Sequence, residues 1–250
     1  MLCALFVLLA LADNSCKQTL DATVVALQQK NPVRAKSILE SAPAECGQVS
    51  SFYELTGVTD NLNGDSARAE QDFERAVALH PREPRLLAEL GTIYLKNGKV
   101  NNAADVLSQA LKLNPSNSDI GKYLIAAYVG LNRWQDVAEM FDKLGAGRKP
   151  GILDPPVMIL WFARALIETK RLGQIDKLLS PTQPGMTSPV LFSLSQLFAE
   201  HGMYSQVVRF LRQIPARDAD DAVSFNLGLA YSHLKRFDVA RRFYFESLVS

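Results

Sequence analysis

The chain has 250 residues, of which 48% are hydrophobic, and its 27 basic and 26 acidic residues give a formal net charge of +1. A balance this close to neutral provides no long-range attraction to DNA, RNA or anionic lipid, so we expect no nucleic-acid partner. A single compact domain of this length would approach the size limit of one core. An array of repeats escapes that limit, because each repeat contacts only its neighbours.

The N-terminal segment, 1–12, is an apolar run that ends in Ala10-Leu11-Ala12. Twelve residues are too few to cross a bilayer as a helix, so we expect no transmembrane span. The small–x–small ending before Asp13 is typical of a signal-peptidase site, although no Lys or Arg precedes the apolar run. We therefore expect 1–12 to be a signal peptide and the protein to be exported, periplasmic or extracellular. A buried first helix is the alternative.

Two cysteines, Cys16 and Cys46, follow this segment. Cys16 begins the first expected helix, 17–29, and Cys46 follows the second, 33–41. These two ends are neighbours in an antiparallel hairpin, so a disulfide is geometrically reasonable in an oxidising compartment. Two free thiols are the alternative. We expect no metal site, because there is no CxxC motif and no nearby His to complete one.

A small or branched apolar residue returns at a nearly constant period, and a large apolar residue follows it by four positions each time. The steps are 34, 34, 34, 38, 32 and 33 residues, for Ala35, Ala69, Ala103, Val137, Ile175, Val207 and Ala240. A constant period of this length predicts stacked helical hairpins, seven in all.

The stretch from Pro84 to Pro115 shows the hairpin most clearly. Its first helix has one apolar face at steps of three and four residues, formed by Leu87, Leu90 and Tyr94. Gly91 has no side chain, so a second helix can pack closely against the first. The turn is expected at Asn97-Gly98, and the second helix carries the matching stripe Ala103, Leu107 and Ala110.

These residue types at these offsets resemble the tetratricopeptide repeat, a helix–turn–helix unit of about 34 residues. The resemblance implies an all-α, right-handed superhelical solenoid of about seven such repeats. Repeats one to four would occupy 13–148 and repeats five to seven 156–250, with the array continuing beyond the chain end. The glycine- and proline-rich stretch between them includes 149–155, which is either a hinge between two sub-stacks or a longer loop that leaves the stacking intact.

Aromatic residues follow the turns at Trp134, Tyr204 and Phe237, and their helical spacing predicts core positions. The last expected helix is different, because it carries several large apolar residues with no repeat after it: Phe243, Phe245, Leu248 and Val249. Terminal repeats usually need a polar outer face. We therefore expect this end to continue into a longer protein, to dock on a partner, or to self-associate.

No catalytic motif is present in the sequence, and each of the three histidines, His80, His201 and His233, is expected near a helix end. A histidine there is favoured by the helix dipole, which explains it without a catalytic role. We expect neither an enzyme nor a bound cofactor.

The resemblance implies a concave groove lined by the first helix of each repeat. Its projected residues, besides Glu54, Asn61 and Ser232, are Arg85, Thr92, Lys96, Asp119, Lys122, Leu160, Arg164, Phe192, Gln196, Phe225 and His233. The middle of this set is cationic and its C-terminal part is more aromatic. A peptide with acidic residues beside apolar anchors would be complementary. The alternative is that these residues are ordinary solvated side chains.

The sequence thus predicts a non-catalytic protein–protein interaction scaffold that binds a peptide or protein segment in the groove. Two alternatives remain open at this point. The chain is a docking or regulatory region of a larger enzyme whose catalytic domain lies elsewhere, or it is a self-associating structural module.

Overall fold

A computed structural model describes residues 2–144, 157–175 and 186–249, with side chains from Ser15 onward except those of Leu144 and Val249. Within these ranges all regular structure is helical, and no strand occurs. The all-α repeat fold predicted from the sequence is confirmed. The chain divides into two compact units, Met1–Leu131 (unit 1) and Asn132–Ser250 (unit 2).

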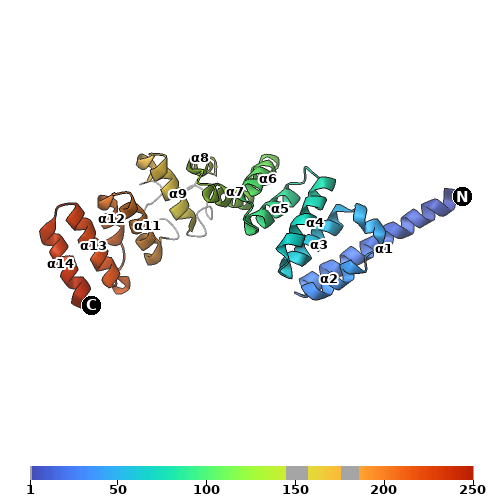
Figure 1. Cartoon of the computed structure of the whole chain (residues 1–250), viewed down its shortest axis with the longest axis horizontal. Coiled ribbons are helices and arrows are strands. Elements are labelled where there is room, and N and C mark those ends of the chain that lie inside the picture. Colours follow the sequence, from blue (N-terminus) through green and yellow to red (C-terminus); the bar gives the residue numbers. More distant parts are fainter. Residues whose placement is uncertain (1, 145–156, 176–185, 250) are drawn as a thin grey trace. The chain divides into compact units, whose positions relative to one another are not determined.

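In unit 1, consecutive helices pack as hairpins, and the second helix of each hairpin also contacts the first helix of the next (Figure 1). The elements are α1 (Leu2–Gln28), α2 (Pro32–Glu40), the 3-10 helix η1 (Ala44–Gln48), α3 (Ser50–Leu62), α4 (Ser66–Leu79), α5 (Pro84–Lys96), α6 (Val100–Leu113) and α7 (Ser118–Gly130).

Unit 2 continues the pattern, with α11 packed on α12, α12 on α13, and α13 on α14. Its elements are α8 (Trp134–Leu144), α9 (Val157–Glu168), the 3-10 helix η2 (Leu172–Gln174), α11 (Ser188–Glu200), α12 (Tyr204–Leu211), the 3-10 helix η3 (Ala216–Asp218), α13 (Asp221–His233) and α14 (Phe237–Val249). Most of the second helix expected in repeat five falls in 176–185, outside the described residues.

The close helix–helix approach predicted at Gly91 is confirmed. A Cβ atom at this position would lie 2.5 Å from Cγ of Leu107 on α6. The same contact recurs at Gly57 against Phe73 and at Gly228 against Tyr244, where a Cβ would lie 2.8 Å from the aromatic ring. In the hairpins that have glycine at this position, the two helices can therefore pack more closely than they could with any larger residue there.

The N-terminal helix differs from the expectation in its start. α1 runs without a break from Leu2 to Gln28, so Cys16 lies inside the helix rather than at its beginning. Cys16 and Cys46 form a disulfide, their Cα atoms are 5.4 Å apart, and both residues are buried. Cys46 lies in η1, a short helix that the sequence pattern did not predict. The bridge therefore ties α1 to the segment that enters repeat two.

Two further predictions, the hinge at 149–155 and the core positions of three aromatic residues, had different outcomes. The predicted hinge at 149–155 lies outside the described residues, while the two units divide between Leu131 and Asn132, in the turn of repeat four. The prediction of a core position is wrong for Phe237, which is 65% exposed, and Trp134 and Tyr204 are half-buried. Helical spacing predicts which residues lie on the same face of a helix. Whether that face is buried depends on another helix packing against it.

We expect Gly91→Val to lower the free energy of unfolding by about 1–3 kcal/mol, because the new side chain would overlap Leu107 in a packed core. Gly173→Val is the matched control, since a Cβ at Gly173 has no neighbouring heavy atom within 4 Å. Urea unfolding followed by circular dichroism would measure both variants. Equal stability of the two would contradict the packing role of Gly91.

Candidate functional site

In unit 1, the first helices of successive repeats place several of the predicted groove residues side by side. Arg85 on α5 forms a two-pronged ion pair with Glu54 on α3, with Nη2 2.8 Å from Oε2. The hydrogen bonds from this guanidinium to Glu54 raise the pKa of Arg85 above its ordinary value. Lys96 on α5 likewise donates to the Asn61 side chain on α3, with Nζ 2.6 Å from Oδ1. The projected positions therefore meet across repeats.

The remaining predicted residues of unit 1 make local contacts. Thr92 donates its hydroxyl to the backbone carbonyl of Glu89, at 2.7 Å. Lys122 pairs with Asp119 on the same helix, with Nζ 3.3 Å from Oδ1. The cationic middle expected from the sequence is thus largely neutralised, because Arg85 and Lys122 both face carboxylates.

A cavity of 470 Å³ lies between the N-terminal parts of α5 and α7. It brings the predicted residues Arg85 and Asp119 together with Glu89 and Tyr123. Tyr123 is 44% exposed, and burial raises the pKa of the Glu89 carboxyl. The pattern of groove positions did not single out Glu89 or Tyr123, although both lie on the same helices as residues that it did. The cavity offers an exposed aromatic surface beside one paired cation and several carboxylates.

In unit 2, two predicted groove residues instead pack against the preceding repeat. The Arg164 guanidinium lies 5.3 Å from the ring centroid of Trp134, and the His233 ring stacks on Tyr204 with centroids 3.9 Å apart. These contacts half-bury both aromatic rings. Arg164 and His233 therefore contribute to the stacking of repeats, a role that the groove pattern did not predict.

The other predicted residues of unit 2 are more open. Phe192 lines a second cavity, of 600 Å³, between the N-terminal parts of α11 and α13, together with Pro189, Ile214 and Val223. Leu160 is half-buried, whereas Gln196 and Phe225 are exposed. Like the cavity of unit 1, this one opens between the first helices of two successive repeats.

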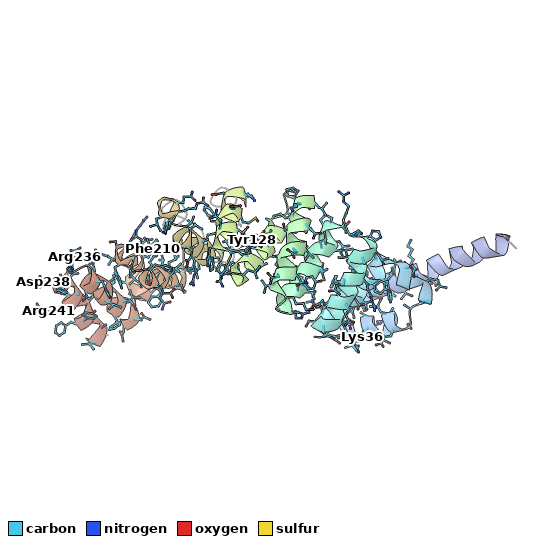
Figure 2. All side chains as sticks on the ribbon, turned by 45° about the horizontal axis from the view of Figure 1, so that its top comes forward. Lys36, Tyr128, Phe210, Arg236, Asp238 and Arg241 are labelled. Atoms are coloured by element: carbon cyan, nitrogen blue, oxygen red, sulfur yellow. A yellow bond between two sulfur atoms is a disulfide. The ribbon has the colours of Figure 1, made fainter. Side chains whose placement is uncertain are left out.

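A buried polar cluster lies deeper in unit 1, between α2, α3 and α4. Asp60 and Asp72 are both buried, and Nζ of Lys36 lies 2.8 Å from Oδ1 of Asp60. Figure 2 labels Lys36 at this end of the chain. Burial, helped by the nearby Asp60 carboxylate, raises the pKa of Asp72 to about 6, and Arg75, Arg68 and Lys36 oppose the shift. The cluster lies between helices of the fold rather than in either cavity, so we assign it a structural role.

No group of His, Cys, Asp and Glu side chains in the described parts of the chain could hold a metal ion. Over the same residues, no helix is both long and apolar enough to cross a membrane. His80 and His201 follow the last residues of α4 and α11, and His233 ends α13, so the predicted placement of the histidines at helix ends is confirmed.

Comparison with known proteins places this fold in a family. A family model described as tetratricopeptide repeat matches residues 63–118. A tetratricopeptide repeat protein from Parabacteroides merdae superposes with a TM-score of 0.61 at 13% identity, covering 94% of this chain and 92% of that one. PilW, a type IV pilus biogenesis factor, gives a TM-score of 0.53 at 18% identity, covering 78% and 90% of the two chains.

A human protein, the protein O-mannosyl-transferase TMTC1, is 22% identical over 187 residues, which cover 73% of this chain and 21% of that protein. The chain thus spans about a fifth of the length of this curated relative. The fold and these matches define an all-α solenoid of stacked helical hairpins. Residues 63–118 match the tetratricopeptide repeat, and the fold of the chain is the one that tetratricopeptide repeat proteins share.

We expect Asp72→Asn to be more stable than the unchanged protein at pH 8 and to lose this advantage as the pH falls towards 5. A carboxyl whose pKa rises from 3.8 to about 6 on folding contributes stability that is complete below pH 3.8 and is lost as the pH rises through 6. The gain at pH 8 should be at most about 3 kcal/mol, since one pKa unit corresponds to about 1.4 kcal/mol.

Urea unfolding at pH 8, 6.5 and 5 would measure the effect. Asp105→Asn, on the exposed surface of α6, is the matched control and should show no such pH dependence. A constant difference between Asp72→Asn and the unchanged protein over this range would contradict the assignment.

Proposed function

We propose that this chain is a non-catalytic scaffold that binds a segment of another protein on the face lined by its first helices. The observation that carries the proposal is the 470 Å³ cavity at α5 and α7, where Arg85, Asp119 and Tyr123 meet. The Glu54 pair already orients Arg85, whose side chain remains 59% exposed and can still donate to a ligand. Side chains that are ordered before binding reduce the entropy cost of association.

The charges around this cavity refine the expected ligand. Arg85 is opposed by Glu54 and accompanied by Glu83, Glu89 and Asp119. We propose a peptide segment that places an apolar side chain against Tyr123 and a basic group near Glu89 and Asp119. Such a ligand replaces the acidic peptide expected from the sequence, because carboxylates already pair with Arg85 and Lys122, two of the cations that would have attracted it.

A photo-crosslinking residue at Tyr123 should capture one defined protein, while the same residue at Lys112, exposed on the second helix α6, should not. Asp119→Lys should reduce capture from Tyr123 by about threefold to tenfold, as expected for the loss of one charge-assisted contact. Mass spectrometry of the crosslinked products would measure both. Equal capture from Tyr123 and Lys112 would remove the support for this face.

A second candidate function is the repeat region of a larger enzyme. The observation that favours it is the match to a human protein O-mannosyl-transferase of which this chain covers 21%. In this case the first-helix face would dock the protein substrate of a catalytic domain elsewhere in the same polypeptide. A complete reading frame that includes a transferase domain would support this candidate. A complete reading frame without such a domain would favour the non-catalytic scaffold proposed above.

Export of the protein is a further part of the proposal. The Cys16–Cys46 disulfide supports it, because structural disulfides persist in oxidising compartments. The apolar segment 1–12 would then be the signal peptide.

The intact mass of the protein isolated from its native cells should show the loss of residues 1–12 and of two further hydrogens, from the disulfide. Treatment with a reductant should restore the two hydrogens and leave the leader mass absent. A retained leader together with two free thiols would contradict export.

A further inference from the structure

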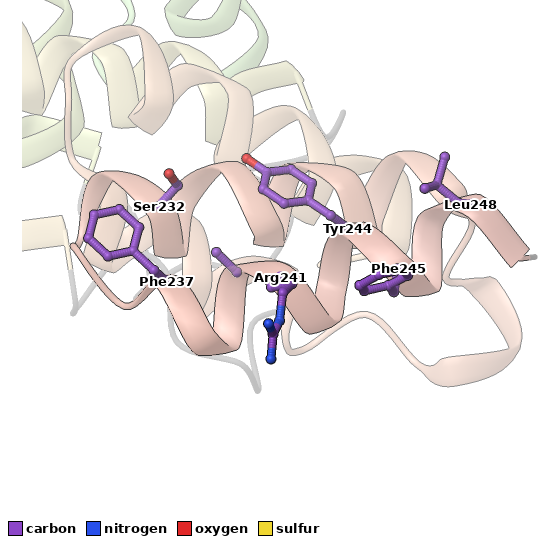
Figure 3. Close-up of a pocket in the computed structure, with 7 residues that line it drawn as sticks. Ser232, Phe237, Arg241, Tyr244, Phe245 and Leu248 are labelled. Atoms are coloured by element: carbon purple, nitrogen blue, oxygen red, sulfur yellow. The ribbon is translucent and has the colours of Figure 1, made fainter.

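The outer face of α14 carries large apolar side chains that nothing in the described chain covers. Phe237, Phe245 and Leu248 are 65%, 62% and 80% exposed. Together with Arg241 and Tyr244 they line an open depression of 380 Å³ (Figure 3). Single exposed apolar residues are ordinary, but a contiguous group of this kind marks an interaction surface.

The preceding repeats show what covers this face elsewhere. The residue equivalent to Phe237 contacts the end of the next repeat's first helix in each of several hairpins. The pairs are Pro32 with Asn63, Ser66 with Asn97, Val100 with Gly130, and Tyr204 with His233, while Trp134 lies against Arg164, which is inside α9 rather than at its end. The position of Phe237 is therefore one that receives a packed helix.

The residue equivalent to Arg241 also has a defined partner in earlier repeats. Lys36 occupies this position on α2, and its Nζ lies 2.8 Å from Oδ1 of Asp60 on α3. Glu70 occupies it on α4, and it accepts a hydrogen bond of 2.8 Å from Asn97 at the end of α5. A charge at this position thus pairs with a group on the helix that packs over it.

The packing of α3 on α2 provides a template for a helix docked on α14. Asp60 and Asn63, near the C-terminal end of α3, contact Lys36 and Pro32 near the N-terminal end of α2, so the two helices run antiparallel. The equivalents of Lys36 and Pro32 on α14 are Arg241 and Phe237. A carboxylate in the place of Asp60 would face Arg241, and the end of the same helix would cover Phe237.

We propose that α14 docks an amphipathic α-helix of a partner protein, which runs antiparallel to α14 and sets a carboxylate against Arg241. Its apolar side chains cover Phe237, Phe245 and Leu248. This surface lies on a second helix of unit 2, so it does not depend on the groove face proposed for unit 1.

Charge favours such a partner over a second copy of this chain. Residues 235–246 contain four basic and two acidic side chains, namely Lys235, Arg236, Arg241 and Arg242 against Asp238 and Glu246. Two copies of this face would bring like net charges together, whereas an acidic helix is complementary. The first helix of a second copy, α1, also lacks the required group. It has Ala26 where α3 has Asp60, and Ala26 is buried in its own repeat.

The test uses the full chain and a synthetic helical peptide with the sequence of residues 50–63, stapled on the side opposite Asp60 and labelled for fluorescence anisotropy. The unchanged protein should bind this probe, and Arg241→Glu should weaken binding about tenfold, as expected for loss of a charge-assisted contact. Arg242→Glu is the matched control, because it makes the same charge change on an exposed residue outside the depression, and should stay within about twofold.

A charge exchange makes the test specific. The peptide with Asp60→Lys should bind Arg241→Glu more tightly than it binds the unchanged protein. No binding of the original peptide up to about 1 mM, or equal weakening by Arg241→Glu and Arg242→Glu, would overturn the proposal. A dimer in sedimentation velocity that Phe245→Ser dissociates would assign the face to a second copy and would overturn it as well.

Discussion

The structure depends on one contact that recurs along the described chain: the second helix of a hairpin packs against the first helix of the next. Most of the described helices contact both the other helix of their own hairpin and a helix of a neighbouring repeat. Because part of their burial comes from the neighbouring repeat, the stability of any one hairpin is shared with the hairpin that follows. The same dependence explains why α14, with no helix packed on its outer face in the described chain, exposes Phe237, Phe245 and Leu248.

The contacts inside a hairpin could be predicted from the sequence, because the residues that make them recur at a fixed period. Gly91 and Leu107 predict a close approach of two helices, and the structure places them as expected. The proximity of Cys16 and Cys46 also followed from hairpin geometry, although the repeat pattern predicted neither η1 nor a helix α1 that runs unbroken through Cys16. Local periodicity therefore determines which residues face each other within a repeat, but leaves the exact ends of helices undetermined.

Contacts between repeats were harder to predict from the sequence. They join side chains about 30 residues apart, and the repeat period does not indicate which of these side chains meet. The groove pattern counted Arg85 and Lys96 towards a cationic middle of the groove, and in the structure both contact the preceding first helix, Arg85 at Glu54 and Lys96 at Asn61. It also marked Arg164 and His233 as groove residues, although both pack on aromatic rings of the preceding second helix. The positions were correctly placed on the first helices, but their environments were set by neighbours.

These two kinds of contact distinguish the two binding surfaces proposed for the chain. On the first-helix face of unit 1, polar side chains are already paired, so a ligand must compete with or complete existing contacts, which favours selectivity over raw affinity. On α14 the apolar side chains are unpaired, and any helix that covers them removes apolar area from water at about 25 cal/mol per Å². A docked helix there would gain most of its affinity from burial, and the contact at Arg241 would select which helix docks and in which direction.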